Sequence, residues 1–457
     1  MHPRKSLNDH NESVTRDGKI AAWLLAFVYL FSGLSPVATS FDSRWTVFIA
    51  MSLCQHGTTN LDEYSRQIRE SHYYGVECVG TDGSVRRGGP DPCAGHWYNI
   101  YPIGGPVLTA PLVLGAVGVM RLFRPLLQHF HSGRPVIAGF LRGDYDAAHP
   151  LLEMEVASFL LALATVVIYF IARRYLPEKR AVILALLYAL ATPAYSVGGR
   201  ALWQHSPSML LLAIIILMLL KAEEKPWLAA WVGLPVALAY TVRPTDSLFV
   251  ILFTAYVAVR HRRYLPYYLL AALPVAAIFL CYNFSIYHQL LSPYYHSRLD
   301  GFHPRNWPTF GEALAGNLIS PSRGLFVYTP IFLFSIWSMV KGWWQAPLKR
   351  WLSALTLAHW IAVSSYVECW WAGDCYGPRF FADLTPVLVL FLIPYLARWE
   401  GLSRVARTAF VACALIGLAM HLRGGWSEAV YEWSVKPVKI GQRLERLWDW
   451  SDPPFLR

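Results

Sequence analysis

The chain has 457 residues, of which 55% are hydrophobic and only 15% are charged, and its mean hydropathy is +0.34. Soluble domains carry about a quarter charged residues, so this composition excludes an ordinary water-soluble enzyme. The 40 Lys and Arg residues against 29 Asp and Glu give a formal charge of +11, but the basic residues punctuate long apolar runs. The charge therefore indicates membrane topology rather than a nucleic-acid partner.

The chain opens with a polar segment, residues 1–19, which we expect to be a disordered cytosolic start. An apolar stretch at 20–39 follows without a cleavage site of small residues, so we expect it to remain as the first membrane span. Ten further stretches are able to cross about 30 Å of hydrocarbon as helices. They lie at 152–172, 181–198, 204–220, 227–241, 246–260, 264–284, 324–340, 350–367, 384–397 and 404–421. The sequence thus predicts an all-α polytopic membrane protein with about 11 transmembrane helices and interfacial helices in a large first extracytoplasmic loop.

Directly after the first span, Asp42 and Arg44 precede a segment with apolar residues at helical spacing. The spacing of Phe48, Ile49 and Leu53 predicts an amphipathic helix along the membrane interface. A carboxylate at this point can take the proton from an attacking hydroxyl, so Asp42 is our candidate general base, with Arg44 as a substrate contact. The alternative is that Asp42 caps a helix N-terminus, and the two roles are compatible.

Farther along the same segment, His96, Tyr98 and Tyr101 stand in an aromatic run. Such side chains can stack on a sugar ring and hydrogen-bond to it, which makes these three candidate substrate contacts. The alternative is the ordinary enrichment of aromatic residues at a membrane interface. The apolar residues 102–120 that follow carry three Pro and two Gly in their first half, so we expect an interfacial or re-entrant helix, with a true span as the alternative.

Ionisable residues are scarce in the middle of the spans and gather where the later spans end on the side of the first loop. A channel or an ion-coupled transporter would place charges near the middle of the membrane. Guanidinium groups bind phosphate oxygens bidentately, and a lipid phosphate is the obvious anion at this depth. Pairing with Asp and snorkelling to headgroups are the alternatives. The candidate substrate-binding residues here are Arg200, His205, Arg243, Arg323, Asp374 and Arg379.

Basic residues in short loops predict the orientation of the chain. Fifteen Lys and Arg residues fall in the short loops on the N-terminal side of the membrane, and three fall in those on the other side. By the positive-inside rule, the N-terminus is cytoplasmic in a bacterial inner (plasma) membrane. Residues 20–421 would then form the transmembrane domain, with the loops 40–150 and 285–323 and the tail 422–457 on the extracytoplasmic side.

Cysteines on the oxidising side suggest two disulfides, Cys78 with Cys93 and Cys369 with Cys375, with unpaired thiols as the alternative. The chain has no dinucleotide-binding, Walker or HExxH motif and no soluble domain large enough for a nucleotide. An activated sugar would therefore have to arrive on a lipid. No ligand spacing typical of a metal site is present, so no cofactor is expected, although a divalent metal is possible.

Together these features resemble the GT-C superfamily of integral-membrane glycosyltransferases, which contains the protein O-mannosyltransferases and the aminoarabinose transferase of lipid A. The resemblance runs from about residue 20 to the C-terminus. It rests on Phe-Asp-Ser-Arg-Trp at 41–45, the amphipathic helix, the aromatic-Pro-Gly stretch, Leu-Trp-Gln-His-Ser-Pro at 202–207 and Arg-Pro-Thr-Asp at 243–246. The segments at 320–325 and 376–380 look like those of bacterial members with unassigned substrates.

The resemblance implies a polyprenyl-phosphate-linked sugar donor, an extracytoplasmic acceptor that is a glycan, a lipid or a protein, and inversion at the anomeric carbon. It also implies that Asp42 deprotonates the acceptor while arginines among Arg200, Arg243, Arg323 and Arg379 neutralise the leaving phosphate. The alternatives are a transporter or flippase for a lipid-linked glycan and a non-catalytic membrane scaffold.

Overall fold

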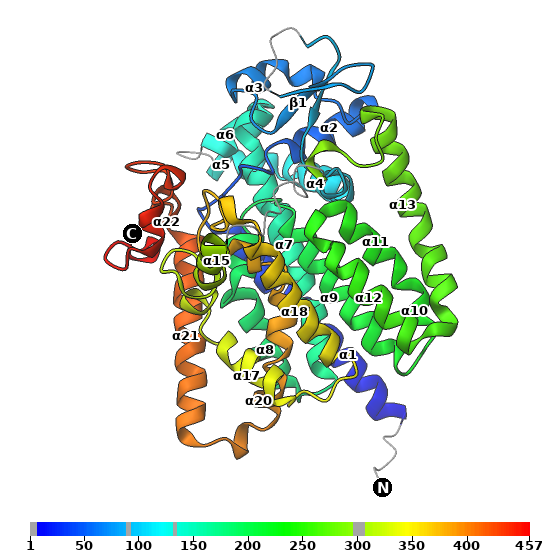
Figure 1. The fold of residues 1–457 in the computed structure, drawn as a ribbon, viewed down its shortest axis with the longest axis vertical. Coiled ribbons are helices and arrows are strands. Elements are labelled where there is room, and N and C mark those ends of the chain that lie inside the picture. Colours follow the sequence, from blue (N-terminus) through cyan, green and yellow to red (C-terminus); the bar gives the residue numbers. More distant parts are fainter. Residues whose placement is uncertain (1–6, 88–92, 131–134, 296–306) are drawn as a thin grey trace.

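The computed structural model describes residues 7–87, 93–130, 135–295 and 307–457. Long helices run side by side along the longest axis of the molecule, and a small sheet lies at one end (Figure 1). The helices that coincide with predicted spans are α1 (Leu7–Gly33), α7 (Tyr145–Arg173), α8 (Glu178–Leu190), α9 (His205–Ala222), α10 (Leu228–Trp231), α11 (Gly233–Val242), α12 (Ser247–Arg260), α13 (Leu265–Tyr287), α16 (Leu325–Tyr328), α17 (Phe332–Lys341), α18 (Lys349–Ser364), α19 (Thr385–Leu390), α20 (Ile393–Ala397) and α21 (Arg404–Trp426).

Every predicted span therefore overlaps one helix or consecutive helices, although α1 ends at Gly33 rather than at residue 39, and the mostly helical class is confirmed. Among the described residues, five helices are long and apolar enough to cross a bilayer: Gly104–Leu122, Tyr145–Arg173, His205–Ala222, Arg262–Tyr287 and Arg404–Trp426. Others are shorter because Pro and Gly interrupt them; α19 and α20 carry Pro386 and Pro394 in their first turns, where the missing N–H has no helical partner. The number of crossings stays a prediction.

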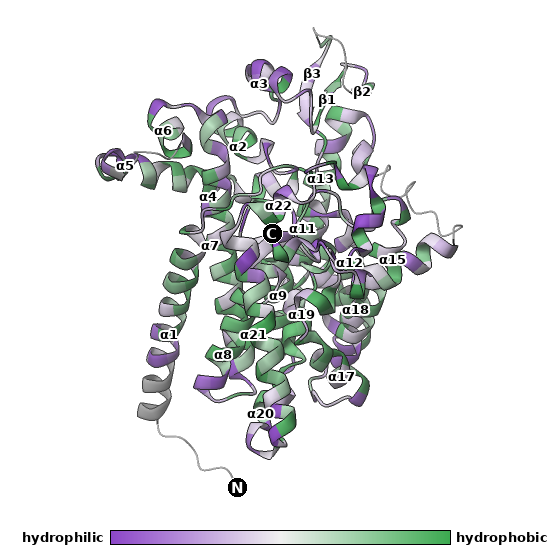
Figure 2. Ribbon diagram, turned by 90° about the vertical axis from the view of Figure 1, so that its left-hand side faces the viewer, coloured by the Kyte–Doolittle hydropathy of each residue, from purple (hydrophilic) through white to green (hydrophobic). Residues whose placement is uncertain are grey.

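Helix α7 lies at the centre of the bundle and contacts α1, α8 and α9. Its residues Leu161, Ile168 and Tyr169 are almost fully buried in the main apolar core. Helix α13, in contrast, exposes large apolar side chains such as Leu270 and Ile278. Exposed apolar area is unfavourable in water at about 25 cal/mol per Å², so a surface of this kind requires an apolar solvent. In Figure 2 the long helices are mostly green, so hydrophobic residues predominate along them.

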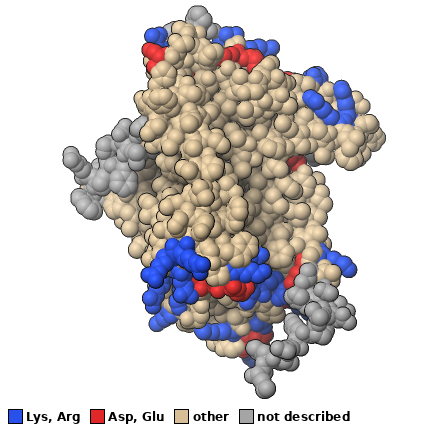
Figure 3. Space-filling model, turned by 90° about the vertical axis from the view of Figure 1, so that its right-hand side faces the viewer, with Lys and Arg blue, Asp and Glu red and all other residues tan. Residues whose placement is uncertain are grey.

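On the face shown in Figure 3, the charged residues gather at the two ends of the molecule, and the surface between these ends has few. At the end that holds the start of α1, ion pairs join loops that are distant in sequence: Arg174 with Glu224, Arg180 with Glu400, and Arg260 with Glu223. These loops are among those predicted to share the cytoplasmic side. The ion pairs place them at one end of the bundle, which supports a multi-pass membrane protein.

The opposite end carries the first loop, which contains a small sheet. Strand β1 (Val76–Val79) lies between β2 (Val85–Arg87) and β3 (His96–Asn99), and both pairings are antiparallel. Cys78 lies opposite Trp97 in this sheet and is disulfide-bonded to Cys93, which confirms the first predicted disulfide. The all-α prediction missed the sheet, because strands of three or four residues are too short to show an alternating pattern.

Helix α2 (Trp45–His56) forms where an amphipathic helix was predicted, but its environment differs from the prediction. Residues 45–52 are all buried. One side packs through Val47 and Ala50 against α4 and α7, and the other packs through Phe48 and Ile49 against α3 (Ser65–Glu70) and the sheet. The helix therefore has no long polar face, because the first loop folds over the side that was expected to meet water.

Helix α4 (Gly104–Leu122) covers the Pro- and Gly-rich stretch. It crosses over the ends of the long helices rather than running beside them, which favours the interfacial interpretation over a true span (Figures 1 and 2). The short helices α5 (Arg124–Phe130) and α6 (Pro135–Arg142) follow it. The N-terminal segment also differs from the prediction. Helix α1 begins at Leu7, so residues 7–19 are helical rather than disordered, and residues 1–6 lie outside the described part.

The C-terminal tail is folded against the same end of the bundle. After α15 (Trp307–Ile319) and the later helices, α22 (Ala429–Glu432) leads into several short 3₁₀ turns. Trp433, Ile440 and Leu447 pack against Trp370 and Trp371 in a separate apolar cluster. The tail is therefore a structured wall of this end of the molecule.

Candidate active site

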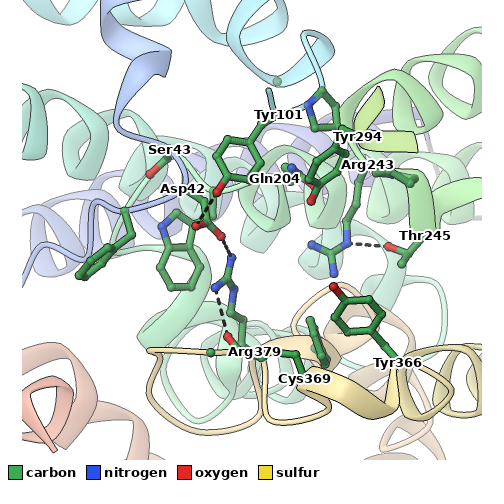
Figure 4. A pocket seen from close by; sticks show the side chains of 18 of the residues that line it. Asp42, Ser43, Tyr101, Gln204, Arg243, Thr245, Tyr294, Tyr366, Cys369 and Arg379 are labelled. Carbon is green, nitrogen blue, oxygen red and sulfur yellow. Dashed lines mark hydrogen bonds and ion pairs between the residues drawn. The ribbon is translucent and has the colours of Figure 1, made fainter. Parts of the chain in front are cut away.

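A cavity of about 1350 Å³ lies between the long helices and the first loop. Its walls come from segments spread over the whole chain: the turn after α1, the strand end before α4, the starts of α9 and α12, the segment after α13, the end of α18, the α18–α19 loop and the C-terminal tail. Of the predicted site residues, Asp42, Arg44, Tyr101, Arg243, Asp374 and Arg379 line this cavity. Figure 4 shows the polar side of the cavity.

Asp42 is held by three neighbours. Its Oδ1 accepts hydrogen bonds from the Tyr74 hydroxyl at 2.6 Å and the Tyr101 hydroxyl at 3.0 Å, and its Oδ2 forms an ion pair with Arg379 Nη2 at 2.5 Å. Burial by itself would raise the pKa of Asp42, but the Arg379 charge and the hydrogen bonds outweigh it and lower the pKa to about 2. The N-cap of α2 is Arg44, with no side-chain cap, so Asp42 does not cap this helix.

Arg379 is positioned by the loop that joins α18 to α19. Its guanidinium lies over the ring of Trp203, 3.8 Å from the ring centroid, in a cation–π contact. It also donates to the Ala372 carbonyl at 3.4 Å and reaches Asp42 across the cavity (Figure 4). The partners come from three distant parts of the chain, and Asp42 and Arg379 are 337 residues apart.

Arg243 reaches the cavity because the chain changes direction at this residue. Helix α11 ends at Val242, and Arg243 is extended, with φ −152° and ψ 129°. The following Pro244 favours this conformation, because its ring clashes with a helical preceding residue. Arg243 Nε donates to Thr245 Oγ1 at 2.6 Å and lies 2.8 Å from Asp383 Oδ2. Figure 4 shows the guanidinium groups of Arg243 and Arg379 on opposite sides of one open space.

Arg44 and Asp374 also lie in the cavity wall. Arg44 forms an ion pair with Asp146 at 2.8 Å, which neutralises its charge. Burial raises the pKa of Asp374, against the opposing charges of Lys439 and Arg323. Neither residue contacts Asp42 or Arg379 directly, so both belong to the rim rather than to the central group.

The side chains of the aromatic run at 96–101 point to two different sides. Tyr101 lines the cavity, but His96 and Tyr98 do not. His96 is bonded to Asp62 at 2.6 Å, and Tyr98 lies beside Tyr287. The reason is the alternation of side chains in β3, which turns alternate residues to opposite faces of the sheet. Contrary to our expectation, Asn99 rather than Tyr98 reaches the cavity.

Arg200 and Arg323 also lie outside the cavity, contrary to the expectation that they bind substrate. Arg200 is fully buried and donates to the carbonyl of Ser32 at 2.8 Å. Arg323 is 2% exposed and donates to the carbonyls of Trp371 at 2.8 Å and Gly373 at 3.1 Å. Both side chains cross-link the backbone, because a guanidinium has several donors and can bridge turns that side-chain packing alone would leave open.

His205 lies behind the cavity wall rather than in it. It is fully buried, and its Nδ1 is 2.7 Å from Asp383 Oδ1. Its Nε2 is 3.2 Å from Arg243 Nη1 and 3.3 Å from Arg379 Nε. It therefore contacts both cavity arginines and has no direct access to a substrate.

The cavity also contains residues that the sequence did not single out. Trp203 and Gln204 belong to the Leu-Trp-Gln-His segment, so their position next to His205 was the available signal. Thr245 belongs to the Arg-Pro-Thr-Asp segment at 243–246, and no sequence signal pointed to the remaining residues. These cavity residues are Tyr74, Trp203, Gln204, Thr245, Tyr294, Tyr366 and the tail segment 439–442.

The second predicted disulfide is not present. The thiol of Cys375 is buried and directed at the carbonyl of Trp371, with Sγ 3.7 Å from the oxygen. Cys369 lies in the cavity wall (Figure 4). The tight turn between them therefore sends the two side chains in different directions. Among the described residues, no group of three or more His, Cys, Asp or Glu is placed to hold a metal ion; His296 and His303 lie outside them.

Fold and cavity together define a multi-pass membrane protein with a carboxylate and two guanidinium groups in one large pocket. Residues 153–287 match the model of the dolichyl-phosphate-mannose-protein mannosyltransferase family, which supports a glycosyltransferase of the GT-C superfamily. No curated protein and no solved structure matches the chain. The matched segment includes His205 and Arg243 but neither Asp42 nor Arg379, so the cavity combines residues inside and outside the family match.

Proposed function

We propose that this protein transfers a sugar from a polyprenyl-phosphate-linked donor to the hydroxyl of an extracytoplasmic acceptor, with inversion at the anomeric carbon. The carrying observation is that Asp42 and Arg379 form an ion pair in a cavity that Arg243 also faces. One carboxylate and two guanidinium groups are the charges that such a transfer requires. They act on the proton of the acceptor and on the phosphate of the donor.

The reaction is a displacement at the anomeric carbon. The acceptor oxygen forms the new bond to this carbon while the bond from carbon to phosphate oxygen breaks, and the polyprenyl phosphate leaves with the bonding electrons. Asp42 takes the acceptor proton as general base. Arg243 and Arg379 neutralise the negative charge that grows on the phosphate, and fixed charges of this kind need no reorganisation during the reaction.

Arg379 links the two halves of this scheme. Its ion pair with Asp42 makes the carboxylate a weak base. A donor phosphate would compete for the same guanidinium, draw it away from Asp42 and raise the basicity of the carboxylate. The base would thus become effective when the donor is in place, which limits the loss of activated sugar to water.

The apolar part of the cavity suits a polyprenyl chain. Leu248, Leu291, Ile361 and Ala362 are among the residues that line it. The clustered basic loops at the opposite end of the molecule support a cytoplasmic location for that end and an extracytoplasmic location for the cavity. A glycan, a lipid or a protein hydroxyl would enter from the first loop and the tail.

The test is a transfer assay on the purified full-length protein in nanodiscs with radiolabelled mannosyl polyprenyl phosphate. Sugar transfer and release of polyprenyl phosphate are measured with candidate acceptors. Asp42→Asn should lower the rate about 10²–10⁴-fold, the usual contribution of a general base, with the protein still folded. Asp82→Asn is the matched control, since Asp82 is an exposed carboxylate of the same loop that accepts hydrogen bonds from Ser84 in its own turn.

Transfer at the wild-type rate by Asp42→Asn would refute the assignment of the base. A protein that moves the lipid-linked sugar across vesicles equally well with either variant, without releasing polyprenyl phosphate, would be a transporter or flippase instead.

A further inference from the structure

We infer that His205 and Asp383 are a positioning pair that aims Arg243 and Arg379 at one phosphate group. The inference rests on the proposed function and assigns a role to two buried residues behind the cavity. Neither residue lines the cavity, so neither contacts the substrate. Both act through the arginines that do.

The pair is anchored at the start of α9 and just before α19. His205 is the first residue of α9, and Asp383 lies two residues before Thr385, where α19 begins. Both residues are fully buried. His205 Nδ1 is 2.7 Å from Asp383 Oδ1, and the other carboxylate oxygen lies 2.8 Å from Arg243 Nε. Asp383 therefore contacts the histidine and one of the two arginines at once.

The contacts assign the tautomer of His205. Guanidinium nitrogens only donate hydrogen bonds, so an Nε2 that faces two of them must present its lone pair. The single ring proton is then on Nδ1, where the Asp383 carboxylate accepts it. A neutral imidazole in this orientation is the acceptor that two neighbouring cations can share.

Sharing one acceptor explains how two cations converge. Like charges repel, and without a common partner the flexible side chains of Arg243 and Arg379 would separate. The Nε2 lone pair holds Arg243 through Nη1 and Arg379 through Nε, at 3.2 and 3.3 Å. Arg243 Nη2 has no hydrogen-bond partner within the described part of the chain, so it remains available to an oxygen in the cavity (Figure 4).

A purely structural role makes a different prediction from a positioning role. If the buried pair only stabilises the fold, its loss should lower stability and leave phosphate binding unchanged in the folded fraction. If it aims the arginines, its loss should weaken phosphate binding in protein that is still folded. Replacement by Gln and by Asn separates these possibilities, because Gln places an amide oxygen near the position of Nε2 and Asn places its amide near Nδ1.

The experiment measures binding of undecaprenyl phosphate to the full-length protein in detergent, with thermal unfolding of each variant as a check on folding. His205→Asn keeps a partner for Asp383 and loses the acceptor for the arginines, so its Kd should rise about tenfold, the value of one hydrogen bond to a charged group. His205→Gln keeps that acceptor and should bind within about threefold of wild type. Asp383→Asn loses the ion pair with Arg243 and should also weaken binding.

His421→Asn is the matched control. His421 is another fully buried histidine, bonded to Ser196 and Thr329 at 2.8 Å each, and has no contact with the cavity arginines. The His421→Asn variant should be less stable than wild type and should keep its affinity for undecaprenyl phosphate. If His205→Asn does not fold, the affinities of Asp383→Asn and His205→Gln for undecaprenyl phosphate are compared instead.

Wild-type affinity in folded His205→Asn, or in folded Asp383→Asn, overturns the inference. So does an equal loss of affinity in His421→Asn. If wild-type protein binds undecaprenyl phosphate but transfers no sugar, the proposed function fails while the positioning role stands on the binding data. If wild-type protein does not bind it at all, both proposals are overturned.

Discussion

Replacing Arg379 by Met should make the activity depend on pH in a range where the wild-type protein does not. Arg379 is the ion-pair partner of Asp42, and Met has a similar length without the charge. In the intact site the pKa of Asp42 falls from 3.8 to about 2, although burial opposes this change. At about 1.4 kcal/mol per unit, the Arg379 charge and the hydrogen bonds outweigh burial by roughly 2–3 kcal/mol.

Without Arg379, burial is opposed only by the hydroxyl groups of Tyr74 and Tyr101, so the pKa of Asp42 should rise to its ordinary value or above. A general base must be ionised to act. In wild type Asp42 remains ionised at every pH well above 2, so kcat/KM should be flat from pH 7 to pH 4.5. In Arg379→Met, kcat/KM should start to fall below about pH 5, approaching tenfold per pH unit once the pH is below the new pKa.

At neutral pH the same variant measures a different effect. Asp42 is ionised in both proteins at pH 7, so the loss there reports the missing charge next to the leaving phosphate. Removing one such preorganised group typically costs about 2.7–4 kcal/mol, or about 10²–10³-fold in rate. The two effects therefore separate along the pH axis.

The assay is the initial rate of sugar transfer at low donor concentration, because kcat/KM reports the ionisation of the free enzyme. Arg243→Met is the matched control: Arg243 pairs with Asp383 rather than Asp42, so it should lose activity at neutral pH without gaining the acid limb. A flat profile in Arg379→Met, or the same acid limb in Arg243→Met, would refute the reasoning.

Three further predictions concern stability and orientation. Replacing Cys78 and Cys93 together by Ser should destabilise the first loop by about 3 kcal/mol, the expected effect of closing a loop with a sequence separation of 15, and unchanged thermal unfolding would contradict this. Arg323→Met leaves buried carbonyls without donors and should cost about 1–3 kcal/mol in denaturant unfolding; equal stability would mean that the turn needs no cross-link. With the other exposed cysteines replaced, a membrane-impermeant maleimide should label Ser84→Cys in intact cells and Gln345→Cys only after permeabilisation, and the reverse would place the cavity in the cytosol.

The helical class of the protein follows from local features of the chain. A run of apolar residues long enough to cross a membrane must satisfy its backbone hydrogen bonds internally, so it forms a helix whatever surrounds it. Asp42 could also be predicted from a local feature, because it is an acidic residue that directly follows the first apolar run. The position of Arg243 at the end of a helix could also be predicted, since the Pro that follows it ends the helix and turns the chain.

Other properties depended on neighbours far away in the sequence. The segment of α2 has apolar residues at helical spacing, but only the fold of the first loop over it decided that both of its sides are buried. Likewise His96 and Tyr98 looked like cavity residues until strand β3 turned them to the opposite face. Short strands and covering loops leave too little local pattern to be predicted.

From the sequence alone came the membrane-embedded helical architecture, the grouping of the basic loops and a set of candidate charges. The tertiary structure decided which of those charges meet. Arg243 and Arg379 converge on His205, whereas Arg200 and Arg323 donate hydrogen bonds to backbone carbonyls. The physical reason is that hydrophobicity acts on each segment separately, whereas the position of a guanidinium depends on packing between helices hundreds of residues apart.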